Sequence, residues 1–282
     1  MLVVLDSGSG QMCNQMLMQA NVLASAIARG YGVEWYNFKR YNGISYKDDC
    51  VEDILYEKNG NPKLKLFVTK VVYNIDRNRF FKKVVMAADE KSVKAYLKNC
   101  LQKQRVFCYG WPFYDLPSLR QNANIIRNFF SPTLEVKKYV KNNMCEGGQI
   151  IIGVHIRRGD YRTWRGGEFY FENKVYKHYM DCLFKQIESK SVHYILFSNE
   201  EIKIDDFECA DYSVSLAEGT AIQDFYMQAS CDYLIGPPSS YSGMASFLGS
   251  VPRFIITSDN EDFSLDRMRV WLMETDGWIN PI

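Results

Sequence analysis

Short apolar segments alternate with amphipathic ones along most of the chain. The first apolar run, 2–5, is followed by Asp6 and a glycine turn. From residue 14 onwards, apolar residues recur at steps of three and four, at Met16, Ala20, Leu23 and Ile27. These steps place the side chains on one face of a helix. Residues 33–36 then predict a second strand, so the chain opens with a strand–helix–strand unit.

A second series of this kind begins after the polar, glycine-containing segment 142–148. Residues 150–156 form a near-continuous apolar run, which is typical of a strand covered on both faces of a parallel sheet. Further strands are expected at 193–197, 233–235 and 253–256, and helices around 176–187, 222–229 and 242–248. We therefore predict an α/β protein with two Rossmann-like domains, 1–145 and 146–282.

Amino-acid composition excludes several classes of protein. The 282 residues are 47% hydrophobic, which is enough to form a core. The 34 basic and 33 acidic residues nearly cancel, and a protein that binds duplex nucleic acid is usually far more basic, so we expect no nucleic-acid partner. The 8 cysteines are dispersed without a CxxC pair, which argues against zinc and a redox dithiol. Because no export signal is recognised, we expect reduced thiols and a cytoplasmic location.

Two long uncharged stretches, 7–28 and 233–252, are not expected to span a membrane. The first contains five side-chain amides, and the second contains three prolines and five serines. Between residues 58 and 105 there are thirteen basic residues and three acidic ones, which we interpret as a basic helical insertion. This region either presents a solvated helical face or makes a peripheral contact with anionic lipid at the inner membrane face. In the second case five apolar residues are available to the interface: Leu64, Leu66, Phe67, Phe80 and Phe81.

Polar residues follow two strands of the second series at their carboxyl ends, where open parallel sheets bind ligands. One strand leads into His155-Ile156-Arg157-Arg158-Gly159-Asp160. Adjacent guanidinium groups suit a diphosphate, and an acid two residues later can hold one of them by an ion pair. The alternatives are an ion pair with a purely structural role and, for His155, an ordinary buried core histidine.

Another strand leads into the segment 236–243, which contains Ser239, Ser240 and Ser242. Serine hydroxyls and backbone N–H groups at the start of a helix form an anion site, although either Ser240 or Ser242 alone is equally well explained as an N-cap. No Walker loop occurs, and no strand is followed by GxGxxG. We predict a diphosphate clamp made by the two loops together, and no metal site.

The motif His155-Ile156-Arg157-Arg158-Gly159-Asp160-Tyr161 resembles the HxRRxD motif of GDP-fucose-dependent fucosyltransferases, most closely the bacterial α-1,2 type. Three further segments are similar to that family in the same order. They are 10–16 (its GGLGNQM loop), 109–129 (its aromatic-then-IRxxF segment) and 224–242 (its DxxLMS…NSSFSWW block). The sequence departs from the family at Cys13, at Pro237-Pro238 and at Gly243-Met244, the last of which replaces a tryptophan pair.

The resemblance implies a GT-B fold, with an acceptor-side N-terminal domain and a C-terminal donor domain facing each other across a cleft. It implies an inverting transferase, without metal or cofactor, that moves L-fucose from GDP-fucose to a glycan acceptor, at O2 of a galactose-type sugar.

The resemblance also assigns roles to individual residues. Arg157 matches the arginine that binds the β-phosphate, and Arg158 and Asp160 match its supporting neighbours. Asp224 matches an acid that contacts guanine. His155 matches a contact on the base side, Ser239 and Ser240 match serines beside the phosphates, and Asn14 matches an asparagine at the sugar. Tyr241 is also expected to bind the donor.

A general base must take the proton of the acceptor hydroxyl. We favour Glu168, on the loop after the arginine motif, with Asp6 as the alternative. Two other functions stay open. One is the same scaffold with another nucleotide sugar, and the other is a non-catalytic protein that binds a sugar nucleotide or a glycan.

Overall fold

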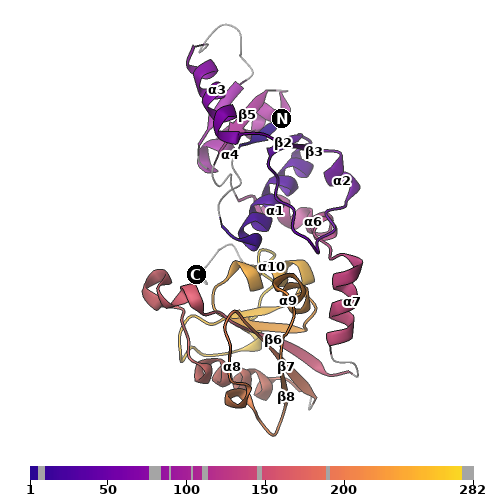
Figure 1. Cartoon of the computed structure of the whole chain (residues 1–282), viewed down its shortest axis with the longest axis vertical. Coiled ribbons are helices and arrows are strands. Elements are labelled where there is room, and N and C mark those ends of the chain that lie inside the picture. Colours follow the sequence, from indigo (N-terminus) through magenta and orange to yellow (C-terminus); the bar gives the residue numbers. More distant parts are fainter. Residues whose placement is uncertain are drawn as a thin grey trace. The chain divides into compact units, whose positions relative to one another are not determined.

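The computed structural model describes residues 1–5, 10–75, 84–88, 90–102, 104–109, 114–144, 148–188 and 191–274. The chain forms two compact units, Met1–Ser131 and Pro132–Ile282, and each contains its own five-stranded parallel sheet (Figure 1). The predicted α/β class with two Rossmann-like folds is therefore confirmed. The units divide before helix α7 (Leu134–Asn143), not after it at 145/146, because α7 packs against α9 (Ala221–Gln228) of the second unit.

The first unit has the strand order β3-β2-β1-β5-β4. Its strands are β1 (Leu2–Val4), β2 (Val33–Tyr36), β3 (Leu55–Lys58), β4 (Val84–Ala87) and β5 (Arg105–Cys108). Its helices are α1 (Met12–Arg29), α2 (Asp49–Glu52), α3 (Pro62–Ile75), α4 (Glu90–Leu101), α5 (Leu116–Gln121) and α6 (Ala123–Phe129).

The region 58–105, which we interpreted as a basic helical insertion, is an integral part of this sheet. It supplies α3, β4 and α4 and leads into β5, which pairs directly with β1. β4 and β5 are only four residues long and lie among lysines. They therefore lack a long apolar run such as residues 150–156 of the second unit.

The second unit has the strand order β10-β9-β6-β7-β8. Its strands are β6 (Ile150–Ile156), β7 (Val192–Ser198), β8 (Ser213–Leu216), β9 (Tyr233–Gly236) and β10 (Arg253–Ile255). Besides α7 and α9, its helices are α8 (Asn173–Gln186) and α10 (Ser240–Gly249). From β6 the chain adds β7 and β8 on one side and then β9 and β10 on the other. The switch point, where such sheets bind ligands, therefore lies between β6 and β9.

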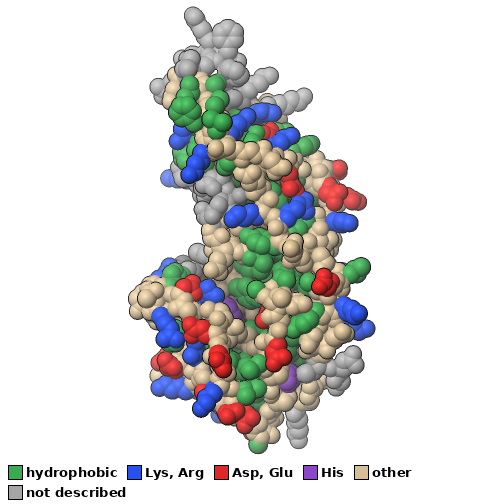
Figure 2. All heavy atoms as spheres, in the orientation of Figure 1, with side chains coloured by type: hydrophobic (Ala, Val, Ile, Leu, Met, Phe, Trp, Pro, Cys, Tyr) green, Lys and Arg blue, Asp and Glu red, His purple; other side chains and the backbone are tan. Residues whose placement is uncertain are grey.

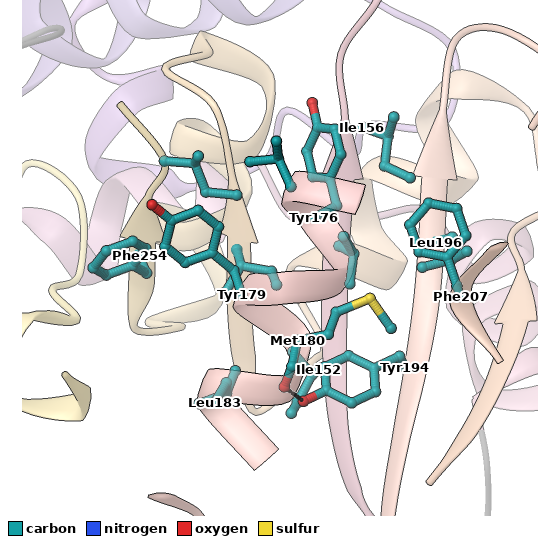
Figure 3. Close-up of a cluster of buried hydrophobic side chains, with 14 of the residues drawn as sticks. Ile152, Ile156, Tyr176, Tyr179, Met180, Leu183, Tyr194, Leu196, Phe207 and Phe254 are labelled. Atoms are coloured by element: carbon teal, nitrogen blue, oxygen red, sulfur yellow. Dashed lines mark hydrogen bonds between the residues drawn. The ribbon is translucent and has the colours of Figure 1, made fainter. Parts of the chain in front are cut away.

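Side chains of β6 alternate between the two faces of its sheet. Ile152, Val154 and Ile156 are buried on the face covered by α8, in the cluster that Figure 3 draws. In this cluster the hydroxyl of Tyr194 donates a hydrogen bond to the Met180 carbonyl at 2.8 Å. Gly153 and His155 lie on the opposite face. This alternation decides where the residues after the strand can point.

The described residues of both uncharged stretches belong to helices and strands of the two units. Residues 233–252 contain β9 and α10, and residues 12–28 lie in α1, most of whose side chains are buried. Within the described ranges, no helix combines the length and the apolar character that a bilayer-crossing segment needs.

Candidate functional site

The loop after β6 holds one arginine beside an acid. Nη2 of Arg157 lies 2.8 Å from Oδ1 of Asp160, so the predicted ion pair is present. The guanidinium also lies over the ring of Tyr161, 5.4 Å from its centroid. Gly159 makes the turn in a left-handed conformation, with φ at 62°. The side chain of Arg157 is 20% exposed and that of Asp160 is 59% exposed, so the cation is largely enclosed but accessible.

Arg158 points to a different part of the unit. Its guanidinium donates to Oδ1 of Asn173, at the start of α8, and lies over the ring of Tyr170, 5.6 Å from the centroid. Its backbone N–H donates to Oδ1 of Asn199 at 2.8 Å. Successive side chains of extended backbone lie on opposite faces, so Arg157 continues the face of His155 and Arg158 continues the face of α8. The expected fork of two adjacent guanidinium groups is therefore not formed, and Arg158 fastens the loop to α8.

The loop after β9 packs directly on the end of β6, which is its neighbour in the sheet. A Cβ on Gly236 would lie 2.6 Å from the carbonyl oxygen of His155, so only glycine fits this approach. Ser239 is the N-cap of α10, and its hydroxyl accepts the N–H of Tyr241 at 3.2 Å. Ser240 begins the helix, whose first N–H groups and dipole favour an anion. The two predicted loops therefore meet.

His155 connects β6 to the first turn of α10. Its side chain is buried, and Nδ1 lies 2.9 Å from the hydroxyl oxygen of Ser242. Burial, and next the nearby guanidinium groups of Arg253 and Arg157, lower the pKa of His155 to about 3. The imidazole is thus neutral at physiological pH, and its contacts are those of a positioning residue.

Tyr241 joins α10 to α9. Its ring lies 5.5 Å, centroid to centroid, from the rings of both His155 and Phe225. Its hydroxyl donates to the carbonyl of Ala221, in the first turn of α9. The starts of the two helices are therefore held together beside the loop after β9.

Asp224 lies in the first turn of α9, behind the capping box that Thr220 forms with Gln223. Its Oδ1 accepts the N–H of Gly219 at 3.0 Å. Burial raises the pKa of Asp224 to about 6. Within the described part of the chain no cation pairs with this carboxylate, so it can accept further N–H donors from a ligand.

Arg253, the first residue of β10, is a site residue that the sequence analysis did not identify. It is 4% exposed, and its guanidinium donates to the carbonyl oxygens of Pro237 at 2.5 Å and Ser239 at 3.4 Å. Among the residues that the structure describes it pairs with no carboxylate, and its Nε has no hydrogen-bond partner. Burial lowers the pKa of Arg253 to about 10, so it is still charged at neutral pH. A buried cation without a counterion thus lies directly behind the start of α10.

Two of the three departures from the fucosyltransferase motif that this sequence resembles have structural explanations. Pro237 and Pro238 offer only carbonyls, and both are used, since Pro237 accepts from Arg253 and Pro238 accepts from the hydroxyl of Tyr161. At Gly243 a Cβ would lie 2.7 Å from the indole of Trp271, so a downstream tryptophan packs where the motif's own tryptophan pair is missing. Cys13 is buried.

No contact with this cluster is described for Asn14 or Glu168. Asn14 belongs to α1 of the first unit, and its side-chain oxygen is buried without a hydrogen-bond partner among the described residues. Glu168 follows three residues with left-handed backbone and is exposed, which leaves its predicted role as a base untested. Asp6, the alternative base, lies outside the described residues.

The described ranges contain no group of three or more His, Cys, Asp or Glu side chains that could hold a metal ion. The ligand chemistry of the site follows from what is present, namely two guanidinium groups, the N-terminus of α10 and a half-buried carboxylate. Such a set suits a ligand with a diphosphate at one end and N–H donors at the other.

Comparison with protein-family profiles and with curated sequences gives no match. Solved structures do match. A mutant of FUT1 from Arabidopsis thaliana in complex with GDP is 12% identical, with a TM-score of 0.59 over 90% of this chain and 70% of that one. POFUT1 in complex with GDP is 13% identical, with a TM-score of 0.55 over 90% and 98%. Fucosyltransferase NodZ from Bradyrhizobium is 14% identical, with a TM-score of 0.52 over 89% and 93%. The chain therefore has the GT-B fold of these fucosyltransferases.

Proposed function

We propose that this protein transfers L-fucose from GDP-fucose to a hydroxyl of a glycan, at O2 of a galactose-type sugar. One observation carries the proposal: Arg157 and the buried, unneutralised Arg253 both lie near His155, which contacts Ser242 in the first turn of α10, at the switch point of the second sheet. The structures similar in fold support the choice of nucleotide, since POFUT1 has been described with GDP and with GDP-fucose. The HxRRxD motif at 155–160 supports the same choice.

In this proposal the donor is held at both ends. The β-phosphate binds Arg157 and the first N–H groups of α10, with the hydroxyls of Ser239 and Ser240 beside it. Guanine donates its N1–H and N2–H₂ to the carboxylate of Asp224, whose elevated pKa reflects burial without a charged partner. His155, Arg158, Asp160 and Tyr241 position these groups and do not take part in proton transfer.

The reaction breaks the bond between C1 of fucose and the β-phosphate oxygen, and the bonding electron pair leaves with GDP. The acceptor oxygen forms a new bond to C1 from the opposite face, which inverts the configuration, and its proton passes to a base, for which Glu168 stays the candidate. Negative charge grows on the departing diphosphate. Arg157, Arg253 and the helix N-terminus stabilise that charge, and we propose that the enzyme needs no metal for this step.

The test is transfer from GDP-fucose to a panel of galactose-terminated glycans in the presence of EDTA, with Arg157→Ala beside the wild type. We expect product without added metal and a loss of about 10²–10³ in rate for the variant. Arg162→Ala is the matched control, because Arg162 lies on the same loop but is 58% exposed and pairs with Glu200. A requirement for a divalent ion, or an Arg157 variant as active as the control, would overturn the mechanism.

Nucleotide binding distinguishes the other functions. GDP should raise the melting temperature, whereas UDP and ADP should not, because they lack guanine's paired N–H donors. Stabilisation by another nucleotide would indicate a different donor. Tight GDP binding without transfer or hydrolysis of GDP-fucose with any acceptor would indicate a binding protein.

A further inference from the structure

Helix α3 exposes a continuous apolar stripe. Leu64, Phe67, Val68 and Val71 follow one another at steps of three, one and three residues, so they lie on one face of the helix. Their exposed fractions are 59%, 65%, 48% and 37%. Figure 2 shows hydrophobic side chains gathered over α3 and bordered by basic ones. Soluble helices normally turn such a stripe towards the core.

The apolar stripe cannot pack on the sheet, because the opposite side of α3 already packs there. Leu66 packs against the buried cluster of Val3, Leu5 and Phe107, on one face of the first sheet. Thr69, one turn further on, is also buried. Leu66 is therefore partly buried against the core and is not available to an interface, as the sequence analysis had considered. Phe80 and Phe81 lie outside the described residues.

Lysines border the stripe on both sides. With 100° between successive residues of a helix, Lys63 and Lys70 lie on one flank and Lys65 on the other. From residue 58 to residue 75 there are four lysines and no acidic residue. The ammonium groups of Lys65 and Lys70 lie 5.9 Å and 4.8 Å from the ring centroids of Tyr36 and Tyr109. Such long, flexible side chains can also extend their ammonium groups outward to anions.

We propose that this surface, named here the α3 face, docks on an anionic lipid bilayer. The helix would lie in the plane of the interface, with its apolar stripe among the upper acyl chains and its lysines at the phosphate groups. A second copy of the chain is disfavoured as the occupant, because two such faces would bring like charges together. The α3 face belongs to the first unit, so the proposal goes beyond the reaction proposed for the second.

Vesicle flotation tests the proposal with the full-length protein. Binding to vesicles of phosphatidylcholine with phosphatidylglycerol is expected at low salt, with much weaker binding to phosphatidylcholine alone and at high salt. Leu64→Ser with Phe67→Ser should lower the partition coefficient at least about tenfold. Lys63→Gln with Lys70→Gln should lower it by about fivefold for each lysine.

Matched controls remove equivalent side chains elsewhere. Leu134→Ser with Leu216→Ser removes two apolar residues that are 85% and 37% exposed in the second unit. Lys137→Gln with Lys138→Gln removes two exposed lysines of α7. Both controls should bind vesicles as the wild type does, and unfolding curves should show that all variants are folded.

Three results would overturn the proposal. The first is wild-type protein that does not float with anionic vesicles at low salt. The second is unchanged binding by the variant at positions 64 and 67. The third is a dimer in sedimentation analysis that the same variant dissociates, without any vesicle binding, because the α3 face would then be a protein interface.

Discussion

Arg253→Met separates phosphate binding from folding stability. Methionine keeps an unbranched apolar stem but removes the charge and the donors to the carbonyls of Pro237 and Ser239. A buried carbonyl left without a donor costs about 1–3 kcal/mol. Burial of the unpaired guanidinium is itself unfavourable, since lowering the pKa from 12.5 to about 10 corresponds to about 3 kcal/mol. Because these effects oppose each other, we expect the free energy of unfolding to change by no more than about 2 kcal/mol.

The effect on anion binding has no such compensation. At an effective dielectric constant of about 20, a unit charge that lies within about 7 Å of a phosphate contributes at least about 2 kcal/mol. Calorimetric titration should therefore show GDP affinity falling about ten- to hundredfold in the Arg253 variant. Guanosine, which has no phosphate, should bind with unchanged affinity. Arg162→Met, which removes an exposed, paired cation from the loop after β6, should change GDP affinity by less than about threefold.

Two outcomes would refute this reasoning. If the Arg253 variant binds GDP as tightly as the wild type, the buried cation does not face the phosphate. If GDP and guanosine lose affinity equally, Arg253 only maintains the shape of the loop. Denaturant unfolding of the same samples gives the stability change independently.

Further predictions concern pH and packing. Asp224→Asn should raise the melting temperature at neutral pH but not near pH 4, because the carboxylate, whose pKa rises from 3.8 to about 6, disfavours the folded state only where it is ionised. The same variant should lose GDP binding, and an equal or lower melting temperature at neutral pH would contradict the assignment. His155→Gln should flatten the decline of unfolding free energy below about pH 6.5, because the folded-state pKa of about 3 lets the unfolded chain take up the proton first. Unfolding titrations with the same slope against pH in both proteins would disprove this. Gly243→Ala should cost about 1–3 kcal/mol, and much less in a Trp271→Ala background, since the added Cβ meets that indole. Additive effects in this double-mutant cycle would rule out the contact.

The second unit was easier to predict because β6 and β7 have seven residues each and are buried along nearly their whole length, although the partly exposed, four-residue β8 was not predicted. The apolar run 150–156 and the motif after it located β6 and the arginine loop, and the helix expected at 242–248 is α10, which begins two residues earlier, at Ser240. The first unit was harder, since β3, β4 and β5 have four residues each and β4 and β5 lie among lysines. Their apolar character becomes evident only once the strands are paired in the sheet.

Within the site, the sequence predicted contacts between residues close in the chain, but not contacts between distant segments. An acid two residues after the arginine pair predicted an ion pair with one guanidinium, and Asp160 forms it with Arg157. Arg158 was misjudged because adjacency in sequence means opposite faces on extended backbone. Arg253 could not be found from the motifs, because it reaches the site only through the pairing of β10 with β9. Trp271 could not be found either, because it contacts α10 from a segment far along the chain.

The most direct measurement of the central claim is a crystal structure of this protein with GDP. The account predicts the β-phosphate against the N–H groups that open α10 and against the guanidinium of Arg157, with guanine hydrogen-bonded to Asp224. Diphosphate bound away from both Arg157 and α10, in well-defined density, would contradict it.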